Sequence, residues 1–378
     1  MFRELKPGCG LTHDMSRLFG FLVALVLCLK ATPTNSEVTG SPGSGVPGVE
    51  LRKASFVKFP GVVDCNSPAH WDGSAMYIFN SAPNVVRSTG TGVFHLGPAN
   101  PTRYTNDANG GRWIEATHKA EDGNLYGWYH NEPHPVCPAK HDLTAPRIGA
   151  AVSTDNGATW KDLGFVLEAP ADSLYCETQN HYFAGGNGDF SVIVDNKKEY
   201  IYFFIGTYNK DVSEQGVAVA RMLYSDRDAP AGKAWKWRDG KWNEAGIGGH
   251  VTPLFPVKID WNRKDADAFW GPSIHWNSFL NQYVILLNRA VDKDWKQEGV
   301  YIAFNPDLAN PTQWSLPRKI LDSKEIKAVP DMGPGWYPQV IGIDSAKRET
   351  DKLAGRVARL FVHGKSVWEI EFVKPGEQ

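Results

Sequence analysis

The chain has 378 residues, of which 22% are charged and 42% hydrophobic, and its formal net charge is −2. These values describe a globular protein. They exclude a disordered tail, a coiled coil and a nucleic-acid binder that works through bulk positive charge. With 37 glycines, 25 prolines and 14 tryptophans, the composition favours many short strands joined by turns over long helices.

An apolar run over residues 18–29 lies between Arg17 and Lys30. It is shorter than the roughly 20 residues that a membrane-spanning helix needs, and it suits the core of a signal peptide. We therefore predict a signal peptide over residues 1–31 and a disordered leader over residues 32–49. The mature protein is expected to be secreted or periplasmic, without a membrane span, and a buried N-terminal helix is the alternative.

Removal of such a peptide leaves three cysteines, Cys65, Cys137 and Cys176. In an oxidising compartment two of them can form a disulfide while the third stays a free thiol. The spacing does not indicate which two pair.

From residue 50 onward, aromatic-rich apolar runs recur beside turn signals. These runs cover residues 77–79, 125–129, 200–204, 283–287 and 359–362. Segments that begin near a glycine and contain small and β-branched residues follow the three middle runs, at 148–153, 216–220 and 299–303. Trp160 and Trp314 each precede a Val-Leu or Ile-Leu pair at the same spacing. Each unit thus contains several strands in a fixed order.

Five such four-stranded units predict an all-β fold, a five-bladed β-propeller, as one domain over residues 50–378. The expected blades cover residues 50–100, 110–170, 183–257, 265–323 and 330–373. A two-sheet sandwich is the alternative, but it does not require this fixed recurrence.

The segment before each aromatic run is expected to be the innermost strand of its blade, which lines the central channel. Three of these segments carry a carboxylate at a similar place, namely Asp64, Glu115 and Asp189. Carboxylates gathered near one axis raise one another's pKa. Glycoside hydrolysis uses such a set, because one protonated acid serves the leaving oxygen while another carboxylate activates water or attacks the sugar.

Over residues 55–372 the blade pattern resembles the five-bladed propeller glycosidases, the group that includes glycoside hydrolase family 43. The resemblance implies an inverting reaction in which Asp64 is the general base and Asp189 orients the site and tunes pKa values. The family commonly has a glutamate as general acid before a Gly-Pro pair on a later inner strand, whereas here Trp270 precedes that pair. The candidates for the acid are, in order, Glu115, Glu177 and Glu132.

Aromatic rings near the inner strands supply a second indication, since sugar rings stack on indole and phenol groups. The predicted substrate contacts are Trp71, Trp113, His118, His130, Trp270, Trp336 and Tyr337. A carbohydrate is the expected partner, and the reaction is expected to require no cofactor or metal. His70 and His275 each precede a tryptophan on an inner strand, where they could hold a structural calcium ion in the central channel.

Residues 153–160 fit the Asp-box pattern Ser-x-Asp-x-Gly-x-Thr-Trp, a hairpin turn of sialidases and other propellers. A single box argues against a sialidase. The rival function is a non-catalytic carbohydrate-binding propeller, which has no need of a carboxyl group with a raised pKa. A lyase that uses Arg112, His118 and His130 is a third reading.

Overall fold

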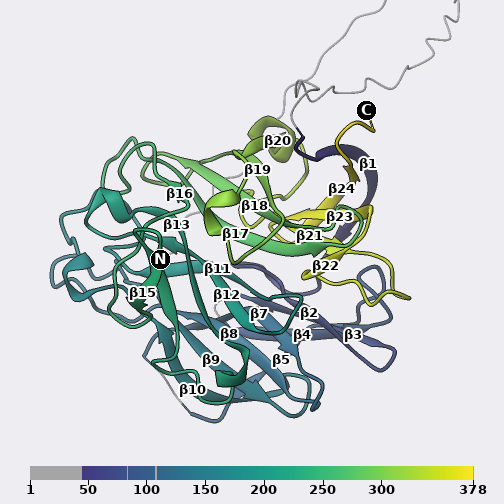
Figure 1. Cartoon of the computed structure of the whole chain (residues 1–378), viewed down its shortest axis with the longest axis horizontal. Helices are drawn as coiled ribbons and strands as arrows, with labels where there is room; N and C mark the ends of the chain where they lie inside the picture. The colour runs from purple at the N-terminus through teal and green to yellow at the C-terminus, as the bar shows by residue number, and fades with distance from the viewer. Residues whose placement is uncertain (1–44, 83, 107–108, 378) are drawn as a thin grey trace, which may run out of the picture. The chain divides into compact units, whose positions relative to one another are not determined.

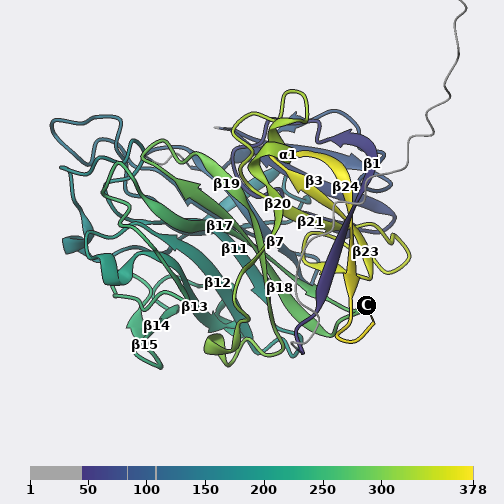
Figure 2. The same ribbon diagram turned by 90° about the horizontal axis from the view of Figure 1, so that it is seen from above.

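The computed structural model describes residues 45–377 except 83, 107 and 108. Its strands form five separate sheets arranged around a common centre (Figures 1 and 2), which confirms the predicted all-β five-bladed propeller. Among the described residues the one α-helix is α1 (Ser323–Lys327). No helix in this part of the chain is long and apolar enough to cross a membrane.

In the first four blades the main strands are antiparallel to their neighbours and run outward from the centre in chain order. The first blade consists of β2 (Ala69–Asp72), β3 (Ala75–Ser81), β4 (Val85–Gly90) and β5 (Asn100–Pro101). The second consists of β7 (Arg112–Lys119), β8 (Leu125–Asn131), β9 (Arg147–Ser153) and β10 (Thr159–Leu167), with β6 (Arg103–Tyr104) beside β10. The third consists of β11 (Asn187–Val194), β12 (Tyr200–Thr207), β13 (Gly216–Leu223), β14 (Trp235–Arg238) and β15 (Lys241–Ala245), with β16 (Phe255–Pro256) beside β13.

The last two blades involve segments from distant parts of the chain. The fourth consists of β17 (Asp267–Asn277), β18 (Gln282–Val291), β19 (Gln297–Asn305) and β20 (Arg318–Asp322), with β22 (Leu353–Ala354) parallel to β17. The fifth consists of β21 (Gln339–Gly342), β23 (Val357–Val362), β24 (Lys365–Val373) and β1 (Gly48–Lys58). The five predicted aromatic runs lie in β3, β8, β12, β18 and β23, the second strand of each blade.

Strand β1 closes the ring of blades. It pairs with β24 from Gly48 opposite Val373 to Lys58 opposite Lys365, and Figure 1 shows the two strands side by side in purple and yellow. The expectation that the first blade begins near residue 50 is therefore wrong for this strand, which completes the fifth blade. Pairing between the two ends of the fold covers an otherwise open sheet edge.

The faces of neighbouring blades pack on each other through apolar side chains. Between the first and second blades, Trp160 is fully buried and its ring lies 5.6 Å from that of Phe79. The hairpin before Trp160 is held by Asp155, whose Oδ1 accepts a hydrogen bond from the Thr159 amide at 2.9 Å. Gly157 in this hairpin has φ +79°, and a Cβ there would lie 2.3 Å from the Phe79 ring.

We predict that Gly157→Ala lowers the free energy of unfolding by about 2–4 kcal/mol, because a methyl group adds a clash to the strain of positive φ. The matched control is Gly73→Ala, since Gly73 has φ +57° but an added Cβ meets no atom within 4 Å. The Gly73→Ala substitution is expected to lower the free energy of unfolding by about 1 kcal/mol, because it adds backbone strain alone. Urea unfolding of both variants measures the difference, and equal losses would contradict the packing argument.

Candidate active site

The inner strands are irregular at the positions of the predicted carboxylates. The pairing of β7 with β8 skips Glu115, and the pairing of β11 with β12 skips Asp189. In β17 the register skips residues 271–272. A bulge of this kind turns the extra residue away from the regular alternation of a strand. Glu115 and Asp189 therefore reach the central cavity, although their neighbours in sequence pack between blades.

A cavity of about 170 Å³ lies where the inner strands begin, and segments from all five blades form its wall. The described residues that line it are Asp64, Trp113, Glu115, His130, Glu132, Asp142, Thr144, Tyr182, Phe183, Asp189, Trp295, Trp336 and Tyr337. Carboxyl groups and aromatic rings thus face the same space, the combination that a saccharide site requires.

Four of the five predicted catalytic carboxylates meet in this cavity, namely Asp64, Glu115, Glu132 and Asp189. The fifth, Glu177, is exposed on the loop that follows Cys176 and does not line the cavity. Glu115 and Asp189 lie on inner strands, Asp64 precedes one, and Glu132 directly follows β8.

Of the predicted substrate contacts, Trp113, His130, Trp336 and Tyr337 line the cavity. Trp270 is fully buried beneath it, with its ring 5.4 Å from Trp336 and 5.5 Å from Tyr337. It supports the aromatic wall rather than forming it.

Two other predicted contacts lie outside the cavity lining. The Trp71 indole donates a hydrogen bond to the Glu349 carbonyl at 2.9 Å. His118 Nε2 lies 3.0 Å from the Tyr224 hydroxyl. Both residues are near the end of an inner strand, whereas the cavity is at its start.

Asp189 is the most constrained residue of the site. It has φ +42°, and its side chain accepts hydrogen bonds from the hydroxyl groups of Tyr208 at 2.5 Å and Tyr337 at 3.2 Å. Burial raises the pKa of Asp189 to about 7; His130 opposes this rise and the Glu115 charge adds to it. A left-handed backbone at a non-glycine residue costs roughly 1–2 kcal/mol, so the surrounding structure holds this carboxyl group in place.

Asp64 is the most accessible of the three inner-strand carboxylates. It precedes β2 and faces the cavity, where protein atoms remove part of its hydration. This desolvation raises the pKa of Asp64 to about 6, and the negative charge of Asp189 adds to the effect. The cavity therefore holds two carboxyl groups that titrate near neutral pH in different environments.

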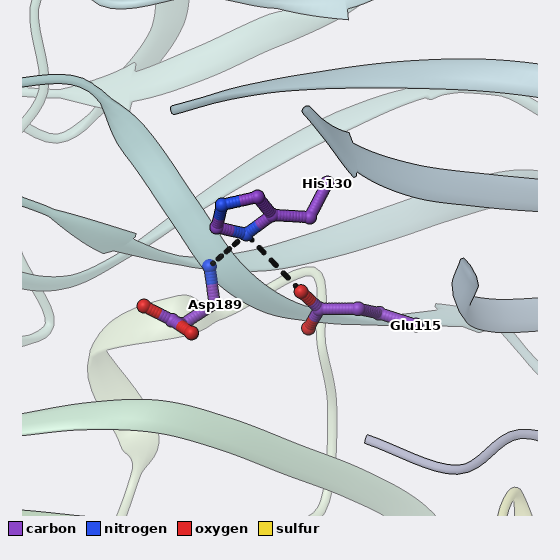
Figure 3. A group of neighbouring side chains, drawn as sticks. All are labelled: Glu115, His130 and Asp189. Carbon is purple, nitrogen blue, oxygen red and sulfur yellow. Dashed lines mark hydrogen bonds and ion pairs between the residues drawn. The ribbon is translucent and has the colours of Figure 1, made fainter. Parts of the chain in front are cut away.

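His130, from β8, connects Glu115 to the backbone of Asp189 (Figure 3). Its Nδ1 lies 3.2 Å from Glu115 Oε1 and accepts a hydrogen bond from the Asp189 amide at 3.1 Å. Its Nε2 lies 3.0 Å from Glu132 Oε1. Glu115 Oε2 accepts a hydrogen bond from the Phe190 amide at 3.0 Å.

Nδ1 of His130 has one lone pair but two neighbours. If the ring is neutral, Nδ1 accepts the Asp189 amide hydrogen, and the proton between His130 and Glu115 belongs to Glu115. If the ring is charged, Nδ1 donates to Glu115 and the amide loses its acceptor. The two side chains thus share one proton. Burial raises the pKa of Glu115, which favours the protonated carboxyl group. Burial also acts to lower the pKa of His130, but the hydrogen bonds and charges of Glu115 and Glu132 outweigh it and raise that pKa, which favours the imidazolium.

Glu115, His130 and Asp189 are also close enough to be considered as metal ligands, since one atom from each lies within 4.8 Å of the others. A metal ion would need the Nδ1 lone pair, because this is the ring nitrogen that faces Glu115. That lone pair accepts the Asp189 amide hydrogen. The hydrogen bonds therefore fit a proton-sharing group better than a metal centre.

His70 and His275, the suggested calcium ligands, pack between blades. The His70 ring stacks on Tyr77 with centroids 5.0 Å apart, and the His275 ring lies 5.6 Å from Phe372 in the fifth blade. Neither ring has a hydrogen-bond partner among the described residues, and burial lowers the pKa of each to about 3. Calcium prefers six to eight oxygen ligands, and these aromatic surroundings do not fit it.

A disulfide joins Cys137 to Cys176, and Cys65 is a buried free thiol. The bridge links the loop after β8 to the loop before β11, and both loops contribute to the cavity wall. Backbone hydrogen bonds reinforce this link, because Thr144 N donates to the Tyr182 carbonyl and Ala184 N donates to the Thr144 carbonyl. One side of the cavity is thus fixed covalently.

Several lining residues were not predicted from the sequence, namely Asp142, Thr144, Tyr182, Phe183 and Trp295. All lie on loops outside the repeated strands. Tyr208, which holds Asp189, was also missed, although it directly follows β12. The one available signal was the dense aromatic content of residues 175–183.

We predict that Asp189→Asn stabilises the protein at alkaline pH. The folded-state pKa of about 7 exceeds the ordinary aspartate value of 3.8, so the charged carboxylate opposes folding above pH 7, and this penalty shrinks as the pH falls toward 4. The expected gain in the free energy of unfolding is about 2–4 kcal/mol at pH 8 and smaller at pH 5. Urea unfolding at both values checks this, with Glu177→Gln as a control for an exposed carboxylate. A loss of stability at pH 8 would contradict it.

Comparison with known proteins gives matches among solved structures, whereas no protein-family model and no curated protein matches the chain. An exo-beta-1,3-galactanase from Phanerochaete chrysosporium is 12% identical with a TM-score of 0.45, over 85% of this chain and 63% of that one. A thermostable family-43 glycoside hydrolase is 12% identical with a TM-score of 0.49, over 84% and 91%. The catalytic domain of a GH62 alpha-L-arabinofuranosidase from Coprinopsis cinerea is 12% identical with a TM-score of 0.44, over 86% and 96%.

Proposed function

We propose that this chain is an exported glycoside hydrolase that cleaves O-glycosidic bonds by carboxyl acid–base catalysis. One observation carries the proposal: Asp64 and Asp189, whose pKa values are raised to about 6 and about 7, face the same aromatic-lined cavity. Hydrolysis of a glycoside needs one carboxyl group that holds a proton near neutral pH and another that can lose it.

A purely sugar-binding propeller is the rival, and the state of Asp189 argues against it. Binding requires only hydrogen-bonding groups and aromatic surfaces. Here a carboxyl group is almost fully buried on a left-handed backbone, with two tyrosine hydroxyl groups on its oxygens. Such an arrangement costs stability, and an acid catalyst is a function that accounts for the cost.

We assign the role of general base to Asp64 and that of general acid to Asp189. Asp64 is the more accessible of the two, which suits a base that must deprotonate water. Asp189 has the higher pKa and its partners are hydroxyl groups, which can rotate as the proton leaves. This assignment gives Asp189 the acid role for which Glu115 ranked first by its position, and it gives Glu115 the tuning role that the family resemblance implied for Asp189.

Glu115 is better suited to raising the pKa of Asp189 than to donating a proton to the substrate. A fixed backbone amide holds Oε2, and Oε1 faces His130. Its charge helps to raise the pKa of Asp189. We therefore propose that Glu115 keeps Asp189 protonated until a glycosidic oxygen accepts the proton.

In the proposed reaction Asp189 donates its proton to the glycosidic oxygen as the bond to the anomeric carbon breaks. Asp64 takes a proton from the water whose oxygen forms the new bond at the opposite face of that carbon. The product then has inverted configuration, which requires carboxyl groups about 6.5–9.5 Å apart to admit the water. Exchange with solvent afterwards restores the proton to Asp189 and removes it from Asp64.

Export of the protein is supported by the bridge between Cys137 and Cys176, because disulfides persist in oxidising compartments. The signal peptide proposed for residues 1–31 lies outside the described residues.

The proposal is tested with aryl glycosides of neutral and amino sugars. Asp64→Asn and Asp189→Asn are expected to lower kcat by about 10²–10⁴-fold on 4-nitrophenyl substrates, as loss of a general acid or base does. With a 2,4-dinitrophenyl leaving group, which needs little protonation, the kcat of Asp189→Asn should fall far less. The kcat of Asp64→Asn should remain low with this leaving group. Glu177→Gln is the matched control and should have the kcat of the wild type.

Absence of hydrolysis by the wild type across aryl glycosides and polysaccharides would overturn the proposed function. If the 2,4-dinitrophenyl leaving group restored the kcat of Glu115→Gln instead of that of Asp189→Asn, Glu115 would be the general acid.

The dependence of kcat/KM on pH should be bell-shaped, with its maximum between about pH 6 and pH 7. Activity falls below pH 6 because Asp64 becomes protonated, and it falls above pH 7 because Asp189 loses its proton. Initial rates at low substrate concentration from pH 4.5 to 8.5 measure both limbs of the curve. The two apparent pKa values belong to Asp64 and Asp189 as an interacting pair. A plateau that extends to pH 8.5 would show that the acid is not Asp189.

A further inference from the structure

The cavity lining has an unusual charge composition. Five carboxyl groups line it, those of Asp64, Glu115, Glu132, Asp142 and Asp189, and no arginine or lysine occurs among the described lining residues. His130 is the one basic side chain in that set, and it is already bonded to the carboxyl groups beside it. A ligand therefore enters a space that offers many hydrogen-bond acceptors and no free cation.

We infer that the cavity takes a single terminal sugar unit that carries an amine or no charge, and that Glu132 and Asp142 select against uronates and sulfated sugars. This inference rests on the proposed function for its hydrolytic part, whereas the charge preference also holds for binding alone. The expected order of affinity is amino sugar, then neutral sugar, then uronate.

The size of the cavity indicates one sugar unit rather than several. Its volume of about 170 Å³ is below the roughly 300–1,000 Å³ of pockets that enclose drug-sized ligands. An internal stretch of polysaccharide needs a groove that is open at two ends. Segments from all five blades contribute to this lining, so the wall surrounds the cavity.

Aromatic contacts join the wall across three blades. Tyr182, on the loop before the third blade, has its ring 5.2 Å from Trp295 of the fourth blade and 5.9 Å from Trp336, which precedes the fifth. On the other side of Tyr182, the disulfide and the backbone hydrogen bonds of Thr144 join the loops of the second and third blades. These contacts close the wall from the second to the fifth blade, and this closure supports action at a chain end.

Glu132 and Asp142 are lining carboxylates to which the proposed reaction gives no role as acid, base or tuner. The Glu132 side chain is 26% exposed, and Asp142 is exposed on the loop after β8. Both carboxyl groups line the cavity that a bound sugar would fill. A carboxylate or sulfate on that sugar would meet like charges without an arginine to pair with, whereas an ammonium group would gain ion pairs.

Basic side chains near the wall are engaged elsewhere. Lys140 donates to the Thr178 carbonyl at 2.6 Å, Arg147 pairs with Glu168 at 3.2 Å and Arg112 pairs with Asp162 at 3.1 Å. Each would have to leave its partner to neutralise an acidic sugar. None of these three basic side chains is therefore free to offset the charge of the lining carboxylates.

Binding of matched monosaccharides to the wild-type chain tests the charge preference without hydrolysis. Galactose, galactosamine and galacturonate form one set, and glucose, glucosamine and glucuronate form another, measured by titration calorimetry at pH 7 and low salt. We expect the uronate to bind at least about 30-fold more weakly than the neutral sugar of its set, and the amino sugar at least as tightly. Asp142→Asn should improve uronate binding by about three- to tenfold, while Glu177→Gln, an exposed carboxylate outside the cavity, should change nothing.

Equal binding of uronate and neutral sugar, or binding of none of the six, would overturn this inference whether or not the chain hydrolyses glycosides. Conversely, the expected order of binding with no hydrolysis of any glycoside would retain the charge preference and reject the proposed function. The chain-end specificity is tested with polysaccharides that the wild type cleaves. Only monosaccharide should appear at early times without loss of viscosity, and early oligosaccharides would contradict a single-unit cavity.

Discussion

The burial of the Asp189 carboxyl group is the constraint on which the rest of the site depends. An isolated carboxylate removed from water is strongly unfavourable, so the protein must either pair it or keep it protonated. Here two tyrosine hydroxyl groups contact its oxygens, and no basic side chain of the described residues pairs with them. The high pKa that follows makes this group suitable as an acid near neutral pH.

The propeller makes this burial feasible because it holds the supporting residues on rigid strands. Glu115 and Asp189 stand at bulges of neighbouring inner strands, so the same backbone irregularity places both side chains at the axis. Ring closure through β1 and β24 keeps the blades at fixed positions around them. The loops between the strands, including the two joined by the disulfide, supply the aromatic wall and the carboxylates of Glu132 and Asp142.

The sequence predicted the parts of this arrangement that repeat. Aromatic runs beside turns identified the second strand of every blade, and the segments before them identified Asp64, Glu115 and Asp189 as neighbours. It could not predict that β1 joins the last blade, because strand pairing over more than 300 residues leaves no local pattern. It ranked Glu115 above Glu177 but could not exclude Glu177, because the bulge that turns Glu115 toward the cavity depends on pairing with β8. Trp295 and Tyr182 meet only through the closed ring, so their contact has no signal in either segment.

His130 links the chemistry of the site to its backbone. With Glu115 protonated, Nδ1 remains free to accept the Asp189 amide hydrogen, and that bond supports the left-handed conformation of Asp189. If Glu115 loses its proton to the ring, the imidazolium is stabilised by Glu115 and Glu132, but the amide loses its acceptor. The position of this one proton therefore decides between the charge on Glu115, which raises the pKa of Asp189, and the hydrogen bond that holds the Asp189 amide. The backbone conformation of Asp189 and the protonation of Glu115 are therefore coupled, because both depend on the single lone pair of His130 Nδ1.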